Sequence, residues 1–70
     1  MNEIISQNRA ILAHLLSGKA ITALEALNIC GCFRLSARIY DLRRRGHNIK
    51  TSTVLVNNKH IASYSLVSDI

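Results

Sequence analysis

Residues 32–46 read CFRLSARIYDLRRRG, a stretch in which apolar residues recur at helical spacing among five arginines. On a helical wheel one side is apolar and is expected to face a core; it carries Cys32, Leu35, Ile39 and Leu42. The opposite side carries Phe33, Ala37, Tyr40 and Arg44. This division predicts an amphipathic helix whose outer side is basic, small or able to form hydrogen bonds.

The flanking sequence predicts two helices before this one and a hairpin after it. Helical spacing of apolar residues predicts a helix over about residues 4–17. Thr22, with Glu25 three residues later, forms a capping box that opens a second helix over about residues 22–28. The basic helix then covers about residues 32–45 and ends before a glycine.

The hairpin is expected over about residues 48–66, which are rich in β-branched side chains. Asn57 and Asn58 form its turn, because asparagine tolerates positive φ better than most residues. This turn pairs Ile49 with Leu66, Thr51 with Tyr64, Thr53 with Ala62 and Leu55 with His60. We expect that face to cover the helices, with Val54 and Ile61 as an apolar pair on the other face.

The length and composition limit the class of protein. Seventy residues, 1–70, form a single domain that buries only about 60% of its unfolded surface. So small a domain has no second layer to enclose a substrate, which argues against an enzyme, and no catalytic residues are expected. No apolar run approaches the roughly 20 residues that span a bilayer, so no membrane partner is expected.

The two cysteines do not predict a disulfide or a metal site. Cys30 and Cys32 stand one residue apart, where a disulfide would be strained, so a reducing cytoplasm fits best. Together with His47 and His60 they lack the two-residue gap of common zinc sites. We therefore expect no metal and no cofactor.

Charge is concentrated in the second half of the chain. Nine basic residues stand against four acidic ones in total, and seven of the nine lie between residues 34 and 59 with Asp41 as the one acid there. Clustering of this kind is typical of proteins that bind polyanions. The alternatives are a solvated surface and, for the last three arginines of the helix, attraction to the helix C-terminus.

The order of elements predicts an α+β fold, a winged helix-turn-helix of three helices followed by a β-hairpin wing. Residues 31–46 resemble a small helix-turn-helix family common in phages and prophages, with the pattern Gly-Cys-x-Arg-Leu-x-x-Arg-Ile-x-x-Leu-Arg-x-x-Gly. They also resemble, more loosely, bacterial winged-helix regulators whose recognition helix ends in Leu-x-x-x-Gly. The similarity covers about residues 6–66 and implies sequence-specific binding of duplex DNA in a phage or prophage.

The basic helix and the wing tip supply the expected DNA contacts. These are Arg34, Ser36, Ala37, Arg38, Tyr40, Arg43, Arg44, Asn57, Asn58 and Lys59. In the major groove Arg34 would pair with guanine, and the small Ser36 and Ala37 allow close approach. Arg38, Arg43 and Arg45 are better placed for phosphates, and the amide end of the second helix is a further candidate phosphate site. Five or six phosphate contacts would make log affinity fall with log salt at a slope of about −5.

These features favour a transcription regulator or an excisionase-like recombination factor. The alternative is a protein–protein interaction module that uses the same scaffold to inhibit or dock on a partner. Val54 and Ile61 are the residues that favour it, and they would equally form a homodimer that reads paired half-sites about one helical turn apart.

Overall fold

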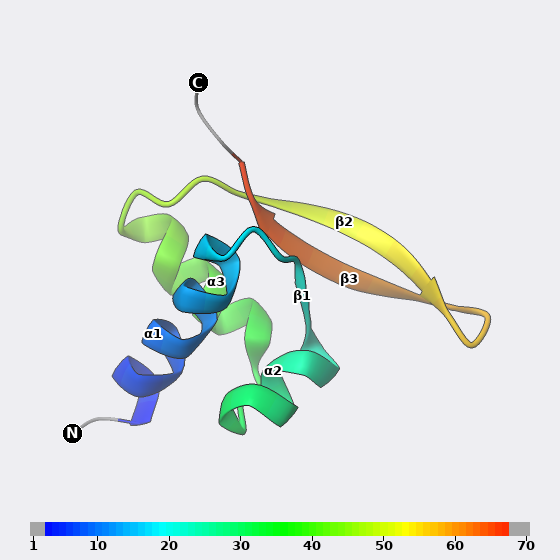
Figure 1. Cartoon of the computed structure of the whole chain (residues 1–70), viewed down its shortest axis with the longest axis horizontal. Helices are drawn as coiled ribbons and strands as arrows, with labels where there is room; N and C mark the ends of the chain where they lie inside the picture. Colours follow the sequence, from blue (N-terminus) through cyan, green and yellow to red (C-terminus); the bar gives the residue numbers. More distant parts are fainter. Residues whose placement is uncertain (1–2, 68–70) are drawn as a thin grey trace.

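The computed structural model describes residues 3–67, which contain three helices and a three-stranded antiparallel sheet. The elements are α1 (Glu3–Leu16), β1 (Ile21–Thr22), α2 (Ala23–Cys30), α3 (Leu35–Arg44), β2 (Ile49–Val56) and β3 (Lys59–Leu66). The helices gather at one end of the β2–β3 hairpin, and the turn of the hairpin projects away from them (Figure 1). The predicted order of three helices followed by a hairpin is confirmed.

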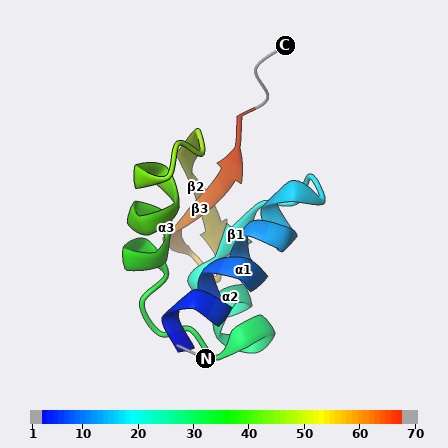
Figure 2. The same cartoon turned by 90° about the vertical axis from the view of Figure 1, so that its left-hand side faces the viewer.

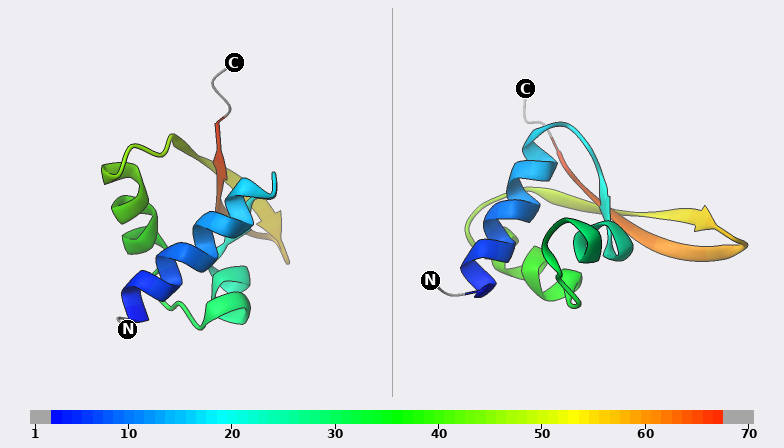
Figure 3. Two further views of the ribbon diagram at one scale, coloured as in Figure 1. Left: turned by 60° about the vertical axis from the view of Figure 1, so that its left-hand side comes forward. Right: turned by 60° about the horizontal axis from the view of Figure 1, so that its bottom comes forward.

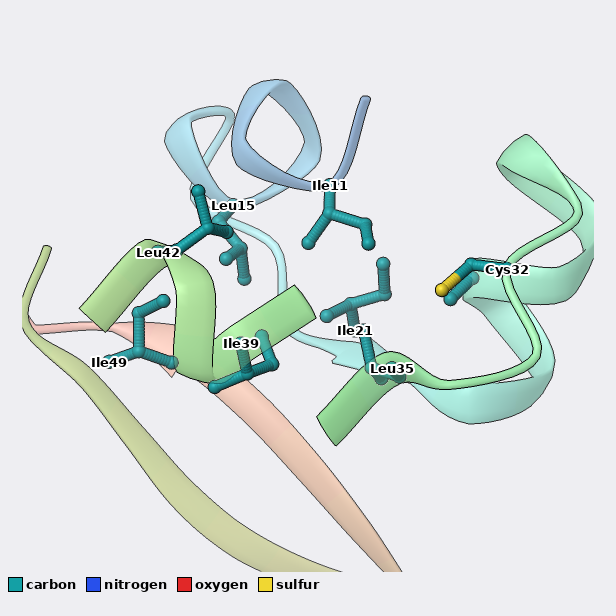
Figure 4. Close-up of a cluster of buried hydrophobic side chains, with 9 residues drawn as sticks. Ile11, Leu15, Ile21, Cys32, Leu35, Ile39, Leu42 and Ile49 are labelled. Atoms are coloured by element: carbon teal, nitrogen blue, oxygen red, sulfur yellow. The ribbon is translucent and has the colours of Figure 1, made fainter. Parts of the chain in front are cut away.

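The core forms where the three helices meet the base of the sheet. Leu35, Ile39 and Leu42 of α3 are buried, as the helical wheel predicted. They point toward side chains from α1 and from the two outer strands of the sheet, β1 and β2 (Figure 4). The buried cluster comprises Ile11, Leu15, Ile21, Ala26, Cys32, Leu35, Ile39, Leu42 and Ile49. Because the core is small, each of its side chains contributes a large share of the apolar burial that stabilises the domain.

The predicted capping box opens α2. The Thr22 amide donates to Oε1 of Glu25 over 3.0 Å, and the Glu25 amide donates to Oγ1 of Thr22 over 3.4 Å. The carboxylate of Glu25 therefore already lies at the positive end of the α2 dipole. A second anion there would be repelled, so the phosphate contact expected at this end of α2 is not supported by the structure.

The basic helix begins later than predicted, at Leu35 and not at Cys32. Gly31 adopts a left-handed conformation with φ of 67°, and its amide donates to the Leu27 carbonyl over 2.9 Å. The Cys32 amide donates to the Ala26 carbonyl over 3.3 Å. These bonds close α2, which runs on to Cys30 instead of ending near residue 28. Since residues 31 and 32 serve the end of α2, they are not free to start α3.

The hairpin has the predicted turn and register. Asn57 and Asn58 both have positive φ, at 51° and 63°, which is the conformation of a type I′ turn. The predicted pairs Ile49–Leu66, Thr51–Tyr64, Thr53–Ala62 and Leu55–His60 are all present. The expectation that this face covers the helices holds only at the base, because Ile49 is buried whereas the rest of β2 is exposed.

A short third strand joins the helices to the hairpin. Ile21 pairs with Tyr64 and Thr22 with Ser63, so β1 lies on β3 and the sheet order is β1-β3-β2. The sequence analysis did not predict this strand, because two residues are too few to show a strand pattern. The pairing leaves β2 as an outer strand whose far edge has no partner strand among residues 3–67.

Ile39 and Tyr40 offer a matched test of this core, since they are adjacent on α3 but Ile39 is buried and Tyr40 is exposed. Ile39→Ala is expected to lower the free energy of unfolding by about 2–5 kcal/mol, because it leaves a cavity in the centre of a small core. Tyr40→Ala is expected to cost less than about 1 kcal/mol. Urea denaturation followed by circular dichroism measures both. Equal losses for the two variants would contradict the assignment of the α3 faces.

Candidate nucleic-acid interface

The outer side of α3, a helix that bears several arginines, is left uncovered by the rest of the fold. Tyr40 is 60% exposed, Ser36 is exposed, and Ala37 is half-buried between them and the core. The guanidinium carbon of Arg44 lies 5.8 Å from the centre of the Tyr40 ring, within reach of a cation–π contact. This contact orients Arg44 along the outer side without neutralising its charge. Ala37, Tyr40 and Arg44 therefore share one face, as the helical wheel predicted, and Ser36 is exposed on its flank.

Arg38 does not belong to this outer face. Its side chain is only 14% exposed, and Nε lies 3.1 Å from Oδ2 of Asp41 one turn along the helix. The contact is an ion pair that falls short of hydrogen-bond geometry. Burial and the neighbouring carboxylate both hold Arg38 against the protein, so its charge is less available to a phosphate than the sequence suggested.

Arg43 binds the hairpin. Its Nε and Nη2 donate to the Ile49 carbonyl over 3.1 and 2.8 Å, and Nη2 also donates to Oγ1 of Thr51 over 3.0 Å. A guanidinium presents its donors in a rigid fork, so three such bonds fix the direction of the side chain. Arg43, expected to contact phosphate, thus joins the end of α3 to the start of β2.

The remaining cations are free of such partners. Arg34 is the N-cap residue of α3 and makes no capping hydrogen bond with its side chain, and Arg45 is the C-cap residue. Both are exposed, as are Lys50 and Lys59 on the hairpin. Within residues 3–67 none of these four enters an ion pair. Arg34 stands at one end of α3 and Arg45 at the other, so positive charge lies along the full length of the helix.

The hairpin tip is a second exposed point, separate from α3. Asn57, Asn58 and Lys59 are all exposed. Figure 1 and the right view of Figure 3 place the turn away from the helices, and Figure 2 shows α3 on one side of the molecule with α1 and its following loop on the other. The sequence-predicted residues therefore form two groups, one on α3 and one at the tip.

Comparison with known proteins identifies this arrangement. A family model described as a winged helix-turn-helix domain matches residues 6–69. The chain belongs to the winged helix-turn-helix domain family. No significant match was found among curated proteins or among solved structures. The predicted fold class is confirmed: α2 and α3 are the helix-turn-helix, and β2 with β3 is the wing.

Two residues at the interface escaped the sequence prediction. Phe33 is 85% exposed in the turn between α2 and α3, and it lines a groove with Arg34 and Ser36. Its outward position on the helical wheel was the available signal, although the residue precedes the helix itself. Thr51 accepts a hydrogen bond from Arg43 across the helix–wing junction. No pattern in the sequence relates those two positions.

The cysteines show no sign of a reactive site. Burial, with a smaller contribution from the neighbouring Cys32, raises the pKa of the Cys30 thiol. A raised pKa keeps this thiol protonated and so a poor nucleophile at neutral pH. Among residues 3–67 no three histidine, cysteine or acidic side chains come together in a way that would hold a metal ion. No helix in the same range has the length and apolar character needed to cross a membrane.

The hydrogen bonds of Arg43 to Ile49 and Thr51 form a helix–wing clamp. Arg43 and Arg45 provide a matched test of this clamp, because the same substitution removes the same charge at two positions only two residues apart. Arg43→Ala is expected to lower the free energy of unfolding by about 1–2 kcal/mol, since it removes charge-assisted hydrogen bonds to Ile49 and Thr51. Arg45→Ala is expected to change it by less than about 0.5 kcal/mol. Thermal and urea denaturation measure both values. An Arg43→Ala protein as stable as Arg45→Ala would show that the clamp has no structural role.

Proposed function

We propose that this protein binds duplex DNA in a sequence-specific manner, with α3 in the major groove and the wing on an adjacent backbone or minor groove. The observation that carries the proposal is the outer face of α3, which is exposed, bears unpaired arginines and lies opposite a fully buried stripe. A helix of this design fits the width of the major groove. Membership of the winged helix-turn-helix family supports the same orientation.

The exposed side chains divide into base-reading and phosphate-binding groups. Arg34, at the N-terminal end of α3, is proposed to pair with a guanine, while Ser36 and Ala37 allow the helix to approach the base edges. Tyr40 and Arg44 extend the contact along the groove as a stacked pair. Arg45 and the two wing lysines, Lys50 and Lys59, are proposed to bind phosphates. The uncharged side chains of Asn57 and Asn58 are proposed to add hydrogen bonds at the wing tip.

Arg38 and Arg43 take a different part in the proposal. Because each is engaged within the protein, they are proposed to position the recognition helix and the wing while adding positive potential. Their charges still attract DNA at a distance, since an ion pair with one carboxylate or a bond to a carbonyl does not cancel the field of the whole face.

The biological role that fits best is regulation of transcription or of recombination in a phage or prophage. The resemblance of residues 31–46 to a small helix-turn-helix family of phages and prophages supports this setting. An excisionase-like role is supported by the net charge of +5, because a basic protein is attracted to DNA. The proposal places the protein in the cytoplasm of a bacterial host.

Binding to a duplex enriched from a random pool, measured by fluorescence anisotropy at several salt concentrations, tests the function. The three proposed phosphate-binding cations predict that log affinity falls with log salt at a slope of about −3. Arg34→Ala and Arg44→Ala are expected to weaken binding by about 5- to 150-fold, the range of a good base contact.

Lys19→Ala is the matched control, because it removes one charge from the loop after α1, which Figures 2 and 3 place away from α3. It is expected to change affinity by less than about threefold. Absence of duplex binding at low salt would overturn the proposal, and so would equal losses for all three variants.

A second function is favoured by the apolar side chains on the outer part of the wing. Val54 is exposed and lies opposite Ile61, which is half-buried in a groove shared with Leu24 and Leu27 of α2. Exposed apolar side chains beside an unpaired strand edge are common where proteins associate. We propose this surface as the contact of a homodimer or, in the alternative function, of a protein partner that the module docks on or inhibits.

Sedimentation equilibrium tests the homodimer separately from DNA binding. A dimer is expected to sediment at twice the chain mass of 7.8 kDa. Val54→Lys is expected to return it to the monomer, because a charge in the centre of an apolar contact is costly. A monomer at all concentrations, both with and without DNA, would rule out this homodimer.

A further inference from the structure

Phe33 is the most exposed large apolar side chain among residues 3–67 and the one phenylalanine of the chain. It is 85% exposed, although burial of a phenylalanine side chain in a core is strongly favourable. A chain with only three aromatic residues thus places one of them almost entirely in solvent. The exposure does not result from an irregular segment, because the residues on both sides of Phe33 have defined positions in the fold.

The neighbours of Phe33 fix the side to which it points. Cys32 is buried in the core and its amide closes α2, whereas Arg34 forms the N-cap of α3. With one neighbour directed inward, Phe33 is directed outward. It lines one groove with Ser36 and Ala62, at the N-terminal end of α3 and beside β3. Phe33 therefore lies where the N-terminal end of the recognition helix meets β3.

The charge around Phe33 indicates what covers it. Arg34, which adjoins it, is exposed and forms no ion pair among residues 3–67, whereas Arg38 and Glu3, which line a further groove with it on the α1 side, are of opposite charge and Arg38 is paired with Asp41. The exposed charge of Arg34 beside an exposed ring favours an anionic partner that also presents apolar groups. In the major groove of duplex DNA, the C5-methyl group of thymine is the apolar group on the base edges. Wedge residues that unstack bases act from the minor groove, which this end of α3 does not face in the proposed orientation.

We propose that Phe33 packs against the C5-methyl group of a thymine next to the base read by Arg34, and so determines sequence preference at that position. This inference rests on the proposed DNA-binding function and deepens it. The ring would be buried only in the complex, which explains why it is exposed in the free protein. Two neighbouring residues at the start of α3 would then recognise two different bases. Arg34 would recognise guanine through hydrogen bonds, and Phe33 would recognise thymine through apolar contact.

Exchange of thymine for uracil tests the contact, because the two bases differ only by the methyl group. Each thymine of the selected duplex is replaced in turn by uracil, and affinity is measured for the wild type and for Phe33→Ala. The wild type is expected to lose about fourfold at one position, the value of burying one methyl group. Phe33→Ala is expected to bind the thymine duplex more weakly and to show no difference between thymine and uracil at that position.

Leu16→Ala is the matched control, because Leu16 is also an exposed apolar side chain, at 67%, and lies at the end of α1. This variant is expected to keep the fourfold discrimination. Since Phe33 is exposed, Phe33→Ala is expected to melt at the temperature of the wild type, and circular dichroism checks this.

The outcomes separate this inference from the proposed function. The protein could bind duplex DNA strongly while Phe33→Ala changes the effect of no thymine-to-uracil exchange. This result would overturn the thymine contact but not the proposal of DNA binding. A wild-type protein that binds no duplex overturns both. Loss of discrimination in Leu16→Ala as well as in Phe33→Ala also overturns the contact, because the effect would then not be specific to the ring.

Discussion

The buried stripe of α3 is the contact on which the rest of the structure depends. Leu35, Ile39 and Leu42 occupy the centre of a core to which α1, β1 and β2 each contribute only one or two side chains. A domain of this size cannot form a second cluster to orient the helix, so this stripe alone sets its rotation. Rotation in turn decides which residues remain outside. The exposure of Ser36, Tyr40 and Arg44 is thus a consequence of packing on the opposite side.

For α3 and the wing tip to contact the same duplex, the angle between α3 and the wing must be fixed as well as the rotation of α3. The Arg43 clamp on Ile49 and Thr51 supplies this connection at one end of the helix. The β1–β3 pairing is a second connection between the helices and the wing. Ile21 of β1 is a core residue and also pairs with Tyr64 of β3. The projecting half of the wing then extends from a rigid base, with its tip held by the two left-handed asparagines.

Local rules were sufficient to predict much of the fold. The register of the hairpin follows from its two-residue turn alone, because once Asn57 and Asn58 are the turn every pair is determined. The capping box of α2 and the inner side of α3 likewise depend on residues three or four apart.

The features that could not be predicted depend on contacts between segments. The start of α3 is displaced because Cys32 closes α2 through a bond to Ala26, and helix propensity does not report such competition. The strand β1 exists only because β3 returns beside it.

The arginines of α3 show why the functional site was harder to predict than the fold. Attraction to the helix C-terminus is the same physical argument for residues 43, 44 and 45, yet their neighbours give them three different states. Arg43 donates to a carbonyl of the wing, Arg44 lies over an aromatic ring, and Arg45 is free among the described residues. The net charge of the face is the same in all three cases. What differs is which guanidinium can leave the protein for a phosphate without breaking an internal bond. Charge patterning therefore locates a nucleic-acid surface, but the division between positioning and contact residues is set by packing across the helix–wing junction.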